Sequence, residues 1–455
     1  MSDLHLTRPM TSASVPTWDG ALWIGAVDLA ELSAPDVDDV VLLAADGYAA
    51  ARLLVRLGRR VLGFVEVPVV DGRVSVDLLR SEAALLEVPP AEPEPIVLPS
   101  VSVVLCTRDR AEHLRGALRS VLELDYPSFE VVVVDNAAAT SETRDLVATA
   151  FDDPRIRYVE QPVPGLSSAR NAGLAAASGD VVAFTDDDVV VDPGWLHGLV
   201  AGFAHGEDVA CVSGLVPSGE LRTPVQRYFD DRVTWSRNVR ARVFRLTEQP
   251  ADLPMFPFSV GAFGTGANFA LRRREALLLG GFDTAFGVGT RTGGGEDLDV
   301  FTRVLFAGHA LVVEPSAVVW HRHRSDVAAL HVQATGYGTG LGAWLTKIAL
   351  DRRTRGLALR RAPRAVAHLV AKRRVAAPTG PATTSTAPLD ESIAAAVARE
   401  ARHELASVVR GPLLYLRQRW DGAGLIGHRS RPAASTSTDV VVTVDGPAPV
   451  VGRAR

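Results

Sequence analysis

Three consecutive aspartates, Asp186 to Asp188, directly follow an apolar, strand-like run. Like charges this close repel one another unless a cation lies between them, and carboxylate oxygens suit Mg²⁺ and Mn²⁺. Alternate residues of an extended chain face the same side, so we expect Asp186 and Asp188 to point together and Asp187 to point away. A solvated turn before Asp192 and Pro193 explains the triplet equally well when it is considered alone.

A second pair of acids, Glu296 and Asp297, follows three glycines, Gly293 to Gly295. Glycine lets the backbone bend close to a ligand, and a carboxylate at the start of the following helix can be aimed into a cleft. One of these acids could act as a general base. Acids are also common in the first turn of a helix for dipole reasons, and for an isolated pair this structural explanation is the more frequent one.

Two histidines, His321 and His323, end a further strand-like run. A neutral imidazole at this position could complete a metal shell begun by Asp188. Both rings face the same side if the chain stays extended, so the sequence does not decide between them. A histidine in isolation is more often structural than a ligand.

A small-residue segment from Gly165 to Gly173 places Arg170 and Asn171 in the first turns of a helix. Arg170 could hold a phosphate group, or it could pair with one of the many acids. The two interpretations carry equal weight.

These residues need a scaffold that brings strand ends together. From Val101 onward, Val-rich runs alternate with amphipathic segments, which is typical of strands buried on both faces and joined by helical crossovers. Ligands of such sheets bind at the carboxyl ends of the strands. The expected strand ends carry polar residues there, namely Thr107 to Arg110, Asp135 and Asn136, and Asp186 to Asp188. We predict an α/β fold with a Rossmann-like, mostly parallel central sheet and helices on both faces.

The chain divides into segments of different composition. Residues 1–95 predict a small, mostly β accessory domain with a hairpin turning near Gly58 to Arg60, and residues 96–325 predict the catalytic domain. A helical extension is expected over 326–425, interrupted by a Pro/Thr-rich linker near 376–389, with a helix from Asp390 to Trp420. Gly338 and Gly342 in this extension indicate close backbone packing. Residues 426–455 predict a disordered tail.

The composition of the 455 residues, with 47% hydrophobic and 22% charged residues and a net charge of −5, is that of a folded protein and excludes a histone-like nucleic-acid binder. The two cysteines, Cys106 and Cys211, lie in apolar runs and predict reduced, buried thiols. The sequence shows no signal peptide and no run of about 18 apolar residues. We therefore expect a cytoplasmic protein, with peripheral association at the inner face of the membrane as an option.

The charge is unevenly distributed along the chain. Residues 321–455 contain 21 Lys and Arg against 9 Asp and Glu, whereas residues 1–320 contain 27 against 44. A solvated helical face is the more frequent meaning of such a basic region. Attraction to anionic lipid or to a polyanionic acceptor is the alternative.

Taken in order, the motifs resemble those of family 2 glycosyltransferases, which have the GT-A fold, over roughly residues 101 to 325. The matching stretches are Cys106-Thr107-Arg108-Asp109-Arg110, Val134-Asp135-Asn136, Ala169-Arg170-Asn171-Ala172-Gly173, Asp186-Asp187-Asp188, Pro193-Gly194-Trp195-Leu196, Gly264-Thr265-Gly266-Ala267-Asn268, Gly280-Gly281-Phe282-Asp283, Gly295-Glu296-Asp297 and Trp320-His321. Asp109 replaces a more usual Asn, and Ala137 to Ala139 replace a Ser/Gly-rich turn.

The resemblance implies an inverting transfer of a sugar from a nucleoside diphosphate to an acceptor hydroxyl. Asp297 would be the general base, assisted by Glu296, while Asp188 and His321 would hold Mn²⁺ or Mg²⁺ against the departing diphosphate. The expected donor-binding residues are Thr107 and Arg108 at the nucleotide edge, Asp135 at the base, Asp186 at the ribose, and also Arg170, Asp187, Gly266 and Asn268.

The expected partners are a nucleoside-diphosphate sugar of the UDP or dTDP type and a hydroxyl acceptor, with a lipid-linked acceptor among the options. The product would belong to a cell-envelope polysaccharide, a glycolipid or a glycosylated metabolite. The sequence leaves the donor sugar, the acceptor and the oligomeric state open.

Two alternatives remain at this point. A nucleotidyltransferase acting on sugar phosphates would need a glycine-rich, Lys/Arg-bearing signature after the first strand, and the stretch following Val101 lacks those glycines. A non-catalytic nucleotide-sugar-binding protein would be indicated by loss of Asp188 or Asp297, and both are present. A Walker-type phosphate loop is excluded because its motif does not occur.

Overall fold

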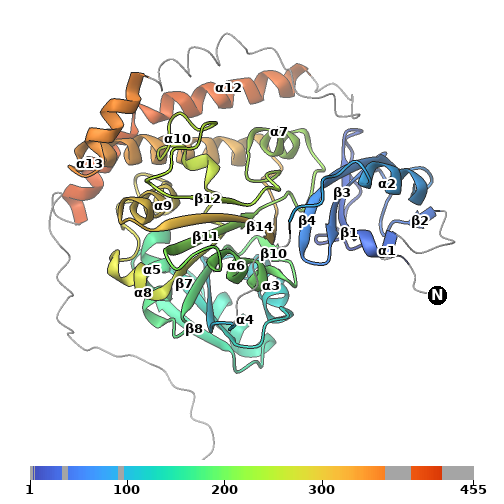
Figure 1. Ribbon diagram of the computed structural model, residues 1–455, viewed down its shortest axis with the longest axis horizontal. Coiled ribbons are helices and arrows are strands. Elements are labelled where there is room, and N and C mark those ends of the chain that lie inside the picture. Colours follow the sequence, from blue (N-terminus) through green and yellow to red (C-terminus); the bar gives the residue numbers. More distant parts are fainter. Residues whose placement is uncertain (1–3, 5, 33–38, 91–96, 364–390, 423–455) are drawn as a thin grey trace, which may run out of the picture.

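The computed structural model describes residues 4, 6–32, 39–90, 97–363 and 391–422. A large α/β unit lies at the centre, a smaller N-terminal unit lies to one side of it, and a layer of C-terminal helices lies along its edge (Figure 1).

A nine-stranded sheet forms the centre of the large unit, in the order β10-β14-β11-β13-β9-β6-β7-β8, with β12 paired to β14. The strands are β6 (Val101–Thr107), β7 (Phe129–Asn136), β8 (Ile156–Gln161), β9 (Val181–Thr185), β10 (Val189–Val191), β11 (Val209–Leu215), β12 (Arg242–Phe244), β13 (Asn268–Arg272) and β14 (Ala310–His321). Strands β6, β7, β8, β9, β11 and β14 run in one direction, and β10, β12 and β13 run in the other. The predicted α/β fold with a mostly parallel sheet is confirmed.

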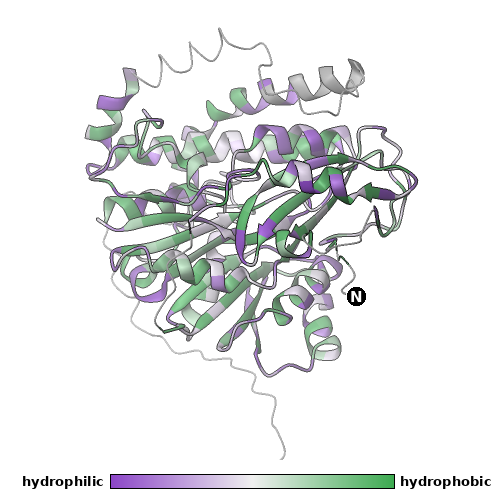
Figure 2. Ribbon diagram, turned by 45° about the vertical axis from the view of Figure 1, so that its right-hand side comes forward, coloured by the Kyte–Doolittle hydropathy of each residue, from purple (hydrophilic) through white to green (hydrophobic). Residues whose placement is uncertain are grey.

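Helices cover both faces of the sheet because its strands are apolar on both sides (Figure 2). In β6, Val103 and Leu105 pack with α3 and α6, whereas Val104 and Cys106 belong to the core that includes α5 and α9. This alternation is the two-residue period of a strand. The helices of the unit are α3 (Ala111–Leu122), α4 (Glu142–Ala150), α5 (Leu166–Ala176), α6 (Trp195–Phe203), α7 (Pro224–Arg232), α8 (Arg273–Leu278) and α9 (Glu296–Phe306), with the short 3₁₀ helix η1 (Val260–Ala262).

The N-terminal unit has its own apolar core and is mostly β structure. Strands β1 (Leu22–Asp28), β3 (Ala50–Leu57) and β4 (Arg60–Pro68) form one sheet, and β2 (Asp39–Val41) and β5 (Arg73–Ser75) form a second. Helices α1 (Leu29–Leu32) and α2 (Val76–Ala83) complete the unit. Strands β3 and β4 form an antiparallel hairpin that turns at Gly58 and Arg59, which confirms the predicted hairpin. The parallel pairing of β1 with β3 was not predicted.

The N-terminal unit packs directly against the large unit. Leu22 and Leu54 of its sheet share an apolar cluster with Val318 and Trp320 of β14. Arg56 of β3 also forms an ion pair of 2.8 Å with Asp192, which follows β10. The N-terminal unit is therefore joined to the part of the sheet that ends at His321.

The C-terminal part contributes α10 (Val327–Leu350), α12 (Glu391–Val408) and α13 (Gly411–Gly422). The single helix predicted from Asp390 to Trp420 is therefore two helices, and Asp390 itself lies outside the described residues. The chain turns at Gly411, where an added Cβ would lie 2.5 Å from the backbone nitrogen of Ala343 in α10. The linker near 376–389 and the tail 426–455 also lie outside the described residues.

The glycines of α10 are used for backbone packing, as predicted. A Cβ added at Gly338 or Gly342 would clash with the carbonyl oxygens of Glu404 and Val408 in α12. Both cysteines are free and buried, and burial raises the pKa of Cys106 to about 12. Among the described residues, no helix combines the length and apolar composition needed to span a bilayer.

Candidate active site

The ends of several strands meet at one rim of the sheet. Thr107 at the end of β6 is paired in register with Asp135 of β7, and β9 is paired in parallel with the other side of β6. The triplet Asp186 to Asp188 follows β9 directly. Strand β10 then pairs antiparallel with the end of β14, so that Val189 lies opposite His321. The register of the sheet thus brings together polar residues that are far apart in sequence.

Asp186, Asp188 and His321 form a cluster in which each residue offers one ligand atom, all within 4.8 Å of one another. Nε2 of His321 lies 3.2 Å from Oδ1 of Asp188. Burial opposes ionisation of Asp188, but His321 and Arg110 hold the pKa of this carboxyl below its usual range. Carboxylates together with an imidazole suit Mn²⁺, and carboxylates suit Mg²⁺. This cluster therefore has the donors and the charge for a divalent metal.

The geometry favours His321 over His323 as a ligand. His323 is buried, its ring centroid lies 4.5 Å from that of Phe229, and its Nδ1 lies 3.0 Å from Nδ1 of His321. Burial, followed by the neighbouring His321, lowers the pKa of His323 to about 3. A neutral His323 can fix the orientation of the His321 ring, whose Nε2 remains directed towards Asp188.

Asp187 lies outside the metal cluster, as predicted, although Asp187 and Asp188 lie in a turn after β9 and not in an extended segment. It accepts a hydrogen bond of 2.7 Å from the Thr107 hydroxyl, and Arg110 donates to it at 2.5 Å. Arg110 also donates to Asp188 at 3.0 Å. Burial raises the pKa of Asp187 to about 7. The contact between Asp187 and Thr107 therefore fixes the position of the triplet on the side away from the metal cluster.

The acid pair begins α9, as the sequence predicts. Gly295 precedes the helix with a φ of 91°, a conformation that favours glycine. Asp297 accepts hydrogen bonds from the backbone N–H groups of Gly266 at 3.0 Å and Leu298 at 2.8 Å. Burial, followed by the charge of Asp297, raises the pKa of Glu296 to about 7. The Asp297 carboxylate is thus held by the backbone.

Arg170 connects the two acidic groups. Its buried guanidinium lies 3.1 Å from Glu296 and 3.4 Å from Asp186, and it donates to the carbonyl oxygen of Gly266 at 2.8 Å. Of the two roles considered for Arg170, the structure shows pairing with acids. The triplet and the acid pair therefore lie in one continuous polar region.

The rim at β7 and β8 contains a buried acceptor without a partner. Asp135 accepts a hydrogen bond of 2.8 Å from the Tyr158 hydroxyl through Oδ2, whereas its buried Oδ1 has no partner. Burial raises the pKa of Asp135. Because an unpaired buried acceptor is costly, this oxygen is suited to a ligand that donates a hydrogen bond.

The two departures from the family pattern lie in neighbouring loops, after β6 and after β7, and contact each other. Asp109 accepts hydrogen bonds from the backbone N–H groups of Ala139 at 2.9 Å and Thr140 at 3.3 Å. Its carboxylate therefore holds the alanine-rich corner in place. Arg108 is exposed at the same rim, with its nearest acid, Asp109, at 3.7 Å.

Asn268 has a structural environment that differs from its predicted role in donor binding. Its amide nitrogen donates to the carbonyl oxygens of Leu215 and Ala317, and its oxygen accepts from Trp195. The side chain is fully buried. Because the protein itself uses both ends of the amide, Asn268 ties β11, β13, β14 and α6 together.

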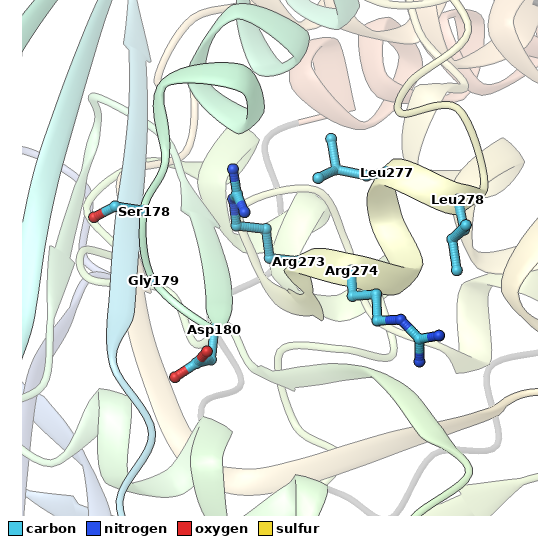
Figure 3. Close-up of a pocket in the computed structure, with 7 residues that line it drawn as sticks. All are labelled: Ser178, Gly179, Asp180, Arg273, Arg274, Leu277 and Leu278. Carbon is cyan, nitrogen blue, oxygen red and sulfur yellow. The ribbon is translucent and has the colours of Figure 1, made fainter. Parts of the chain in front are cut away.

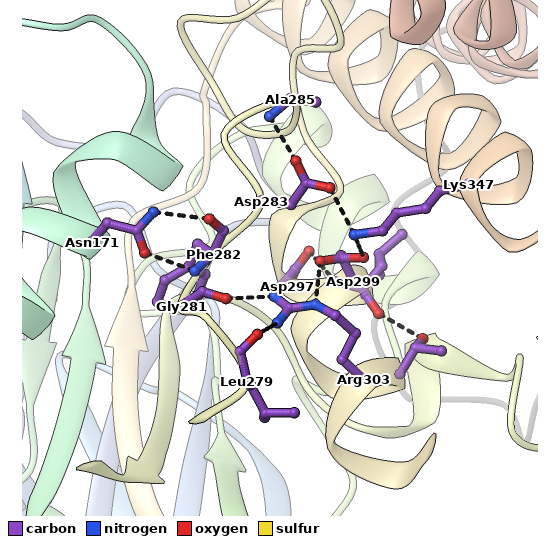
Figure 4. A network of polar contacts seen from close by, with 12 residues as sticks. Asn171, Leu279, Gly281, Phe282, Asp283, Ala285, Asp297, Asp299, Arg303 and Lys347 are labelled. Atoms are coloured by element: carbon purple, nitrogen blue, oxygen red, sulfur yellow. Dashed lines mark hydrogen bonds and ion pairs between the residues drawn. The ribbon is translucent and has the colours of Figure 1, made fainter. Parts of the chain in front are cut away.

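A buried ion network supports α9 behind the acid pair (Figure 4). Lys347 of α10 contacts Asp283 at 2.7 Å and Asp299 at 2.5 Å, and Arg303 contacts Asp299 at 2.7 Å. The side chain of Asn171 holds the loop that contains Asp283. It accepts a hydrogen bond from the N–H of Phe282 and donates one to the carbonyl oxygen of Phe282. The sequence predicted the motifs but not this network.

The N-terminal unit supports the metal cluster through buried charges. Arg52 of β3 lies 2.7 Å from Asp230 of α7, which also pairs with Arg237. Ser218 donates to Asp230 at 2.6 Å, and it forms a β-bridge with His321. The backbone position of His321 therefore depends on a charge cluster that begins in the N-terminal unit.

Sequence reasoning omitted Arg110 and Tyr158 from the site. Arg110 belongs to the motif Cys106 to Arg110, and its position just after a strand could have indicated a role at the rim. Tyr158 had no such signal, because only the pairing of β7 with β8 brings it to Asp135.

A cavity of about 420 Å³ lies away from this rim (Figure 3). It is lined by Ser178, Gly179, Asp180, Arg273, Arg274, Leu277 and Leu278. Arg272 pairs with Val181 at the beginning of β9, so the cavity is at the opposite end of that strand from the triplet. It is not part of the candidate active site.

An α/β sheet with metal-binding acids at its strand ends is typical of proteins that bind nucleotides or phosphates. Residues 102–277 match the model of Glycosyl transferase family 2.

Comparison with curated proteins gives relatives at modest identity. The chain is 31% identical over 274 residues to the pre-mycofactocin glycosyltransferase of Mycobacterium tuberculosis, covering 59% of this chain and 53% of the relative. It is 33% identical over 227 residues to the succinoglycan biosynthesis protein ExoM of Rhizobium meliloti, covering 48% and 65%. The chain therefore spans about half the length of the first relative.

Among solved structures, the mannosyltransferase PcManGT from Pyrobaculum calidifontis, in complex with GDP-Man and Mn²⁺, is 21% identical to this chain. The alignment covers 70% of this chain and 89% of that protein, with a TM-score of 0.45.

Proposed function

We propose that residues 96–325 form a catalytic domain that transfers a sugar from a nucleoside diphosphate to an acceptor hydroxyl, with inversion at the anomeric carbon. The observation that carries this proposal is the position of Arg170, whose guanidinium contacts both Asp186 and Glu296. Metal donors and a candidate base thus belong to one site. The match of residues 102–277 to the model of Glycosyl transferase family 2 supports the same class of reaction.

On the donor side, Asp188 and His321, together with Asp186, would hold Mn²⁺ or Mg²⁺. When bound, such an ion supplies positive charge that stabilises a departing diphosphate. The free Oδ1 of Asp135 is suited to a base that presents a ring N–H, as uracil, thymine and guanine do. Among these donors we propose the UDP or dTDP type.

On the acceptor side, Asp297 would take the proton from the acceptor hydroxyl as its oxygen attacks the anomeric carbon. Two backbone N–H groups fix the carboxylate of Asp297. Glu296 is a positioning residue in this proposal, because its carboxylate is held by Arg170. The proton moves to Asp297 while the diphosphate leaves with the bonding electrons.

The relatives named above suggest the acceptor class. One is a pre-mycofactocin glycosyltransferase and the other a succinoglycan biosynthesis protein, so we propose an acceptor hydroxyl on a metabolite or a growing polysaccharide. A lipid-linked acceptor at the cytoplasmic face of a membrane is the variant of this proposal that the basic C-terminal region supports.

The test is a donor screen followed by a turnover assay. Purified protein is screened against nucleotide sugars by thermal unfolding, with and without Mn²⁺, because a ligand at about 100 times its Kd adds roughly 2.7 kcal/mol of stability. The donors that bind are then assayed for Mn²⁺-dependent release of nucleoside diphosphate with sugar and lipid acceptors. Release with transfer supports the proposal.

Three other outcomes would reject it. Formation of sugar nucleotide from sugar phosphate and nucleoside triphosphate would indicate a nucleotidyltransferase. Binding of a donor without turnover across the acceptor panel would indicate a non-catalytic binding protein. If no nucleotide sugar binds, the proposal of a donor site is rejected.

A further inference from the structure

The outward surface of α12 and α13 carries large, exposed apolar side chains. Its exposed members are Leu405 (57% exposed), Val409 (80%), Leu413 (54%), Leu416 (42%) and Trp420 (78%). Residues three, four and seven apart share one face of a helix, so the members in α13 form a single stripe. The buried residues of α13, Gly411 and Tyr415, lie on the inward side. We call this surface the α12–α13 face.

Positive charges accompany the apolar side chains on this face. Arg399, Arg402, Arg410 and Arg417 are exposed, and within the described part of the chain none of them forms an ion pair. The acids of the same stretch are already paired, with Glu400 on His331, Glu404 on Arg232 and Asp421 on Arg291. The α12–α13 face therefore combines an apolar stripe with uncompensated positive charge.

We propose that the α12–α13 face binds the surface of an anionic lipid bilayer. Tryptophan and leucine side chains enter the boundary between head groups and acyl chains, while arginine remains at the phosphates. The described helices are not of the kind that span a bilayer, so this contact would be peripheral. Both components of interfacial binding, apolar area and positive charge, are present on one surface.

Charge complementarity decides between a lipid surface and the other possible occupants. The sequence of 364–390 contains four Lys and Arg against one Asp, and 423–455 contains four Arg against two Asp. These segments of the chain are positively charged and would be repelled by the four arginines. A second copy presenting the same face would also bring like charges together.

The proposed contact would place the acid pair near the lipid surface. Helix α10 lies between α12 and the glycine loop, and its Gly338 and Gly342 meet the backbone of α12. On its other side, Gly340 packs against Gly294, where an added Cβ would lie 2.7 Å from the carbonyl carbon. One helix thus separates the membrane-binding face from the loop before Glu296 and Asp297.

The experiment measures binding of the full chain to lipid vesicles by co-sedimentation. One set of vesicles is phosphatidylcholine alone, and the other contains about one third phosphatidylglycerol, which gives an anionic surface. We expect binding to the anionic vesicles that decreases as salt is added, because charge contributes to it. The assay needs no nucleotide sugar, so its result is independent of the proposed reaction.

Two variants remove the two components separately. Leu413→Gln with Trp420→Gln removes apolar area without adding charge, and Arg410→Gln with Arg417→Gln should lower the partition coefficient by roughly fivefold for each arginine. The matched controls on α8 are Leu278→Gln, at a residue that is 74% exposed, and Arg274→Gln, at a side chain that is 84% exposed. The controls should bind like the unmodified protein.

Equal binding to both kinds of vesicle, or no binding by the unmodified protein, would overturn the proposal. It would also be overturned if the α8 controls lost as much binding as the α13 variants. A self-association of the unmodified protein that the α13 variants abolish, without vesicle binding, would assign the face to a second copy. Thermal unfolding midpoints check that the substitutions at these exposed positions leave the protein folded.

Discussion

The two sides of the candidate site are built in different ways. On the metal side, Asp186, Asp188 and His321 lie at the ends of hydrogen-bonded strands, and the N-terminal unit braces them through Asp230. On the base side, Glu296 and Asp297 follow a glycine loop that depends on α10 for its position. The strands fix the metal side through register, whereas helix packing fixes the base side.

This difference indicates that the two sides should respond differently to substitution. A change on the metal side should alter binding of metal and nucleotide. A change on the base side should alter turnover while leaving nucleotide binding intact, because Arg170 is the main polar link between the sides.

The largest expected effect comes from changing Asp297, the proposed general base. Asp297→Asn should reduce kcat by roughly 10² to 10⁴, the usual contribution of a general base. Calorimetry should show unchanged Mn²⁺-dependent affinity for the nucleoside diphosphate. A variant with normal kcat would remove Asp297 from this role, and a parallel loss of nucleotide affinity would contradict the separation of the two sides.

The opposite pattern is expected for Asp188, a proposed metal ligand. Asp188→Ala should weaken Mn²⁺-dependent binding of nucleoside diphosphate by more than the roughly 10- to 100-fold that loss of a residue supporting a metal ligand costs. Affinity measured without metal should stay the same in the two proteins. If the unmodified protein binds the nucleotide equally well with and without Mn²⁺, the metal site is rejected.

The brace from the N-terminal unit should affect stability with a defined pH dependence. Burial opposes ionisation of Asp230, but Arg52 and Arg237 hold its pKa below the usual range. Its contribution to stability is therefore present above the unfolded value of about 3.9 and is lost as the pH falls through the folded value. Asp230→Asn should lower the free energy of unfolding at pH 7 by about 3 kcal/mol.

The difference between Asp230→Asn and the unmodified protein should shrink below about pH 4. Asp231→Asn is the matched control, since its side chain is 47% exposed and pairs with the same Arg237. Denaturant unfolding at several pH values measures both. A loss of unfolding free energy that does not depend on pH, or that is equal for Asp230→Asn and Asp231→Asn, would argue against a stabilising role of Asp230.

The smallest effect comes from a single methyl group. Gly340→Ala in α10 places a Cβ against the backbone of Gly294, so it should cost roughly 1 to 3 kcal/mol and slow turnover. Gly116→Ala in α3 has open space around the added Cβ and should instead stabilise by roughly 0.5 to 1 kcal/mol. Equal stability changes in the two variants would show that α10 does not position the loop.

Sequence patterns predicted the elements whose signal is local. The buried Val-rich runs gave the parallel strands β6, β7 and β9, and alternation in the triplet separated Asp187 from Asp186 and Asp188. The choice between His321 and His323 was not accessible, because it depends on how β14 ends and on the packing of Phe229. The break at Gly411 was missed although Gly411 and Pro412 together are a local helix-breaking signal.

Side-chain roles were harder to predict than side-chain positions. Arg170 and Asn268 lie in the predicted motifs, yet their partners come from distant segments that no periodicity reveals. Tyr158 reaches Asp135 only through strand pairing. Long-range polar contacts therefore account for most of what the sequence left open.

The apolar contact between Trp320 and the N-terminal sheet limits how the protein can be shortened. Removal of the residues before β6 would expose the apolar side chain of Trp320, which directly precedes His321 in the sequence. A trimmed protein of this kind would tend to aggregate through the very strand that presents the histidine. A shortened protein for crystallisation should therefore keep the N-terminal unit, or carry polar substitutions at the apolar side chains that its removal exposes.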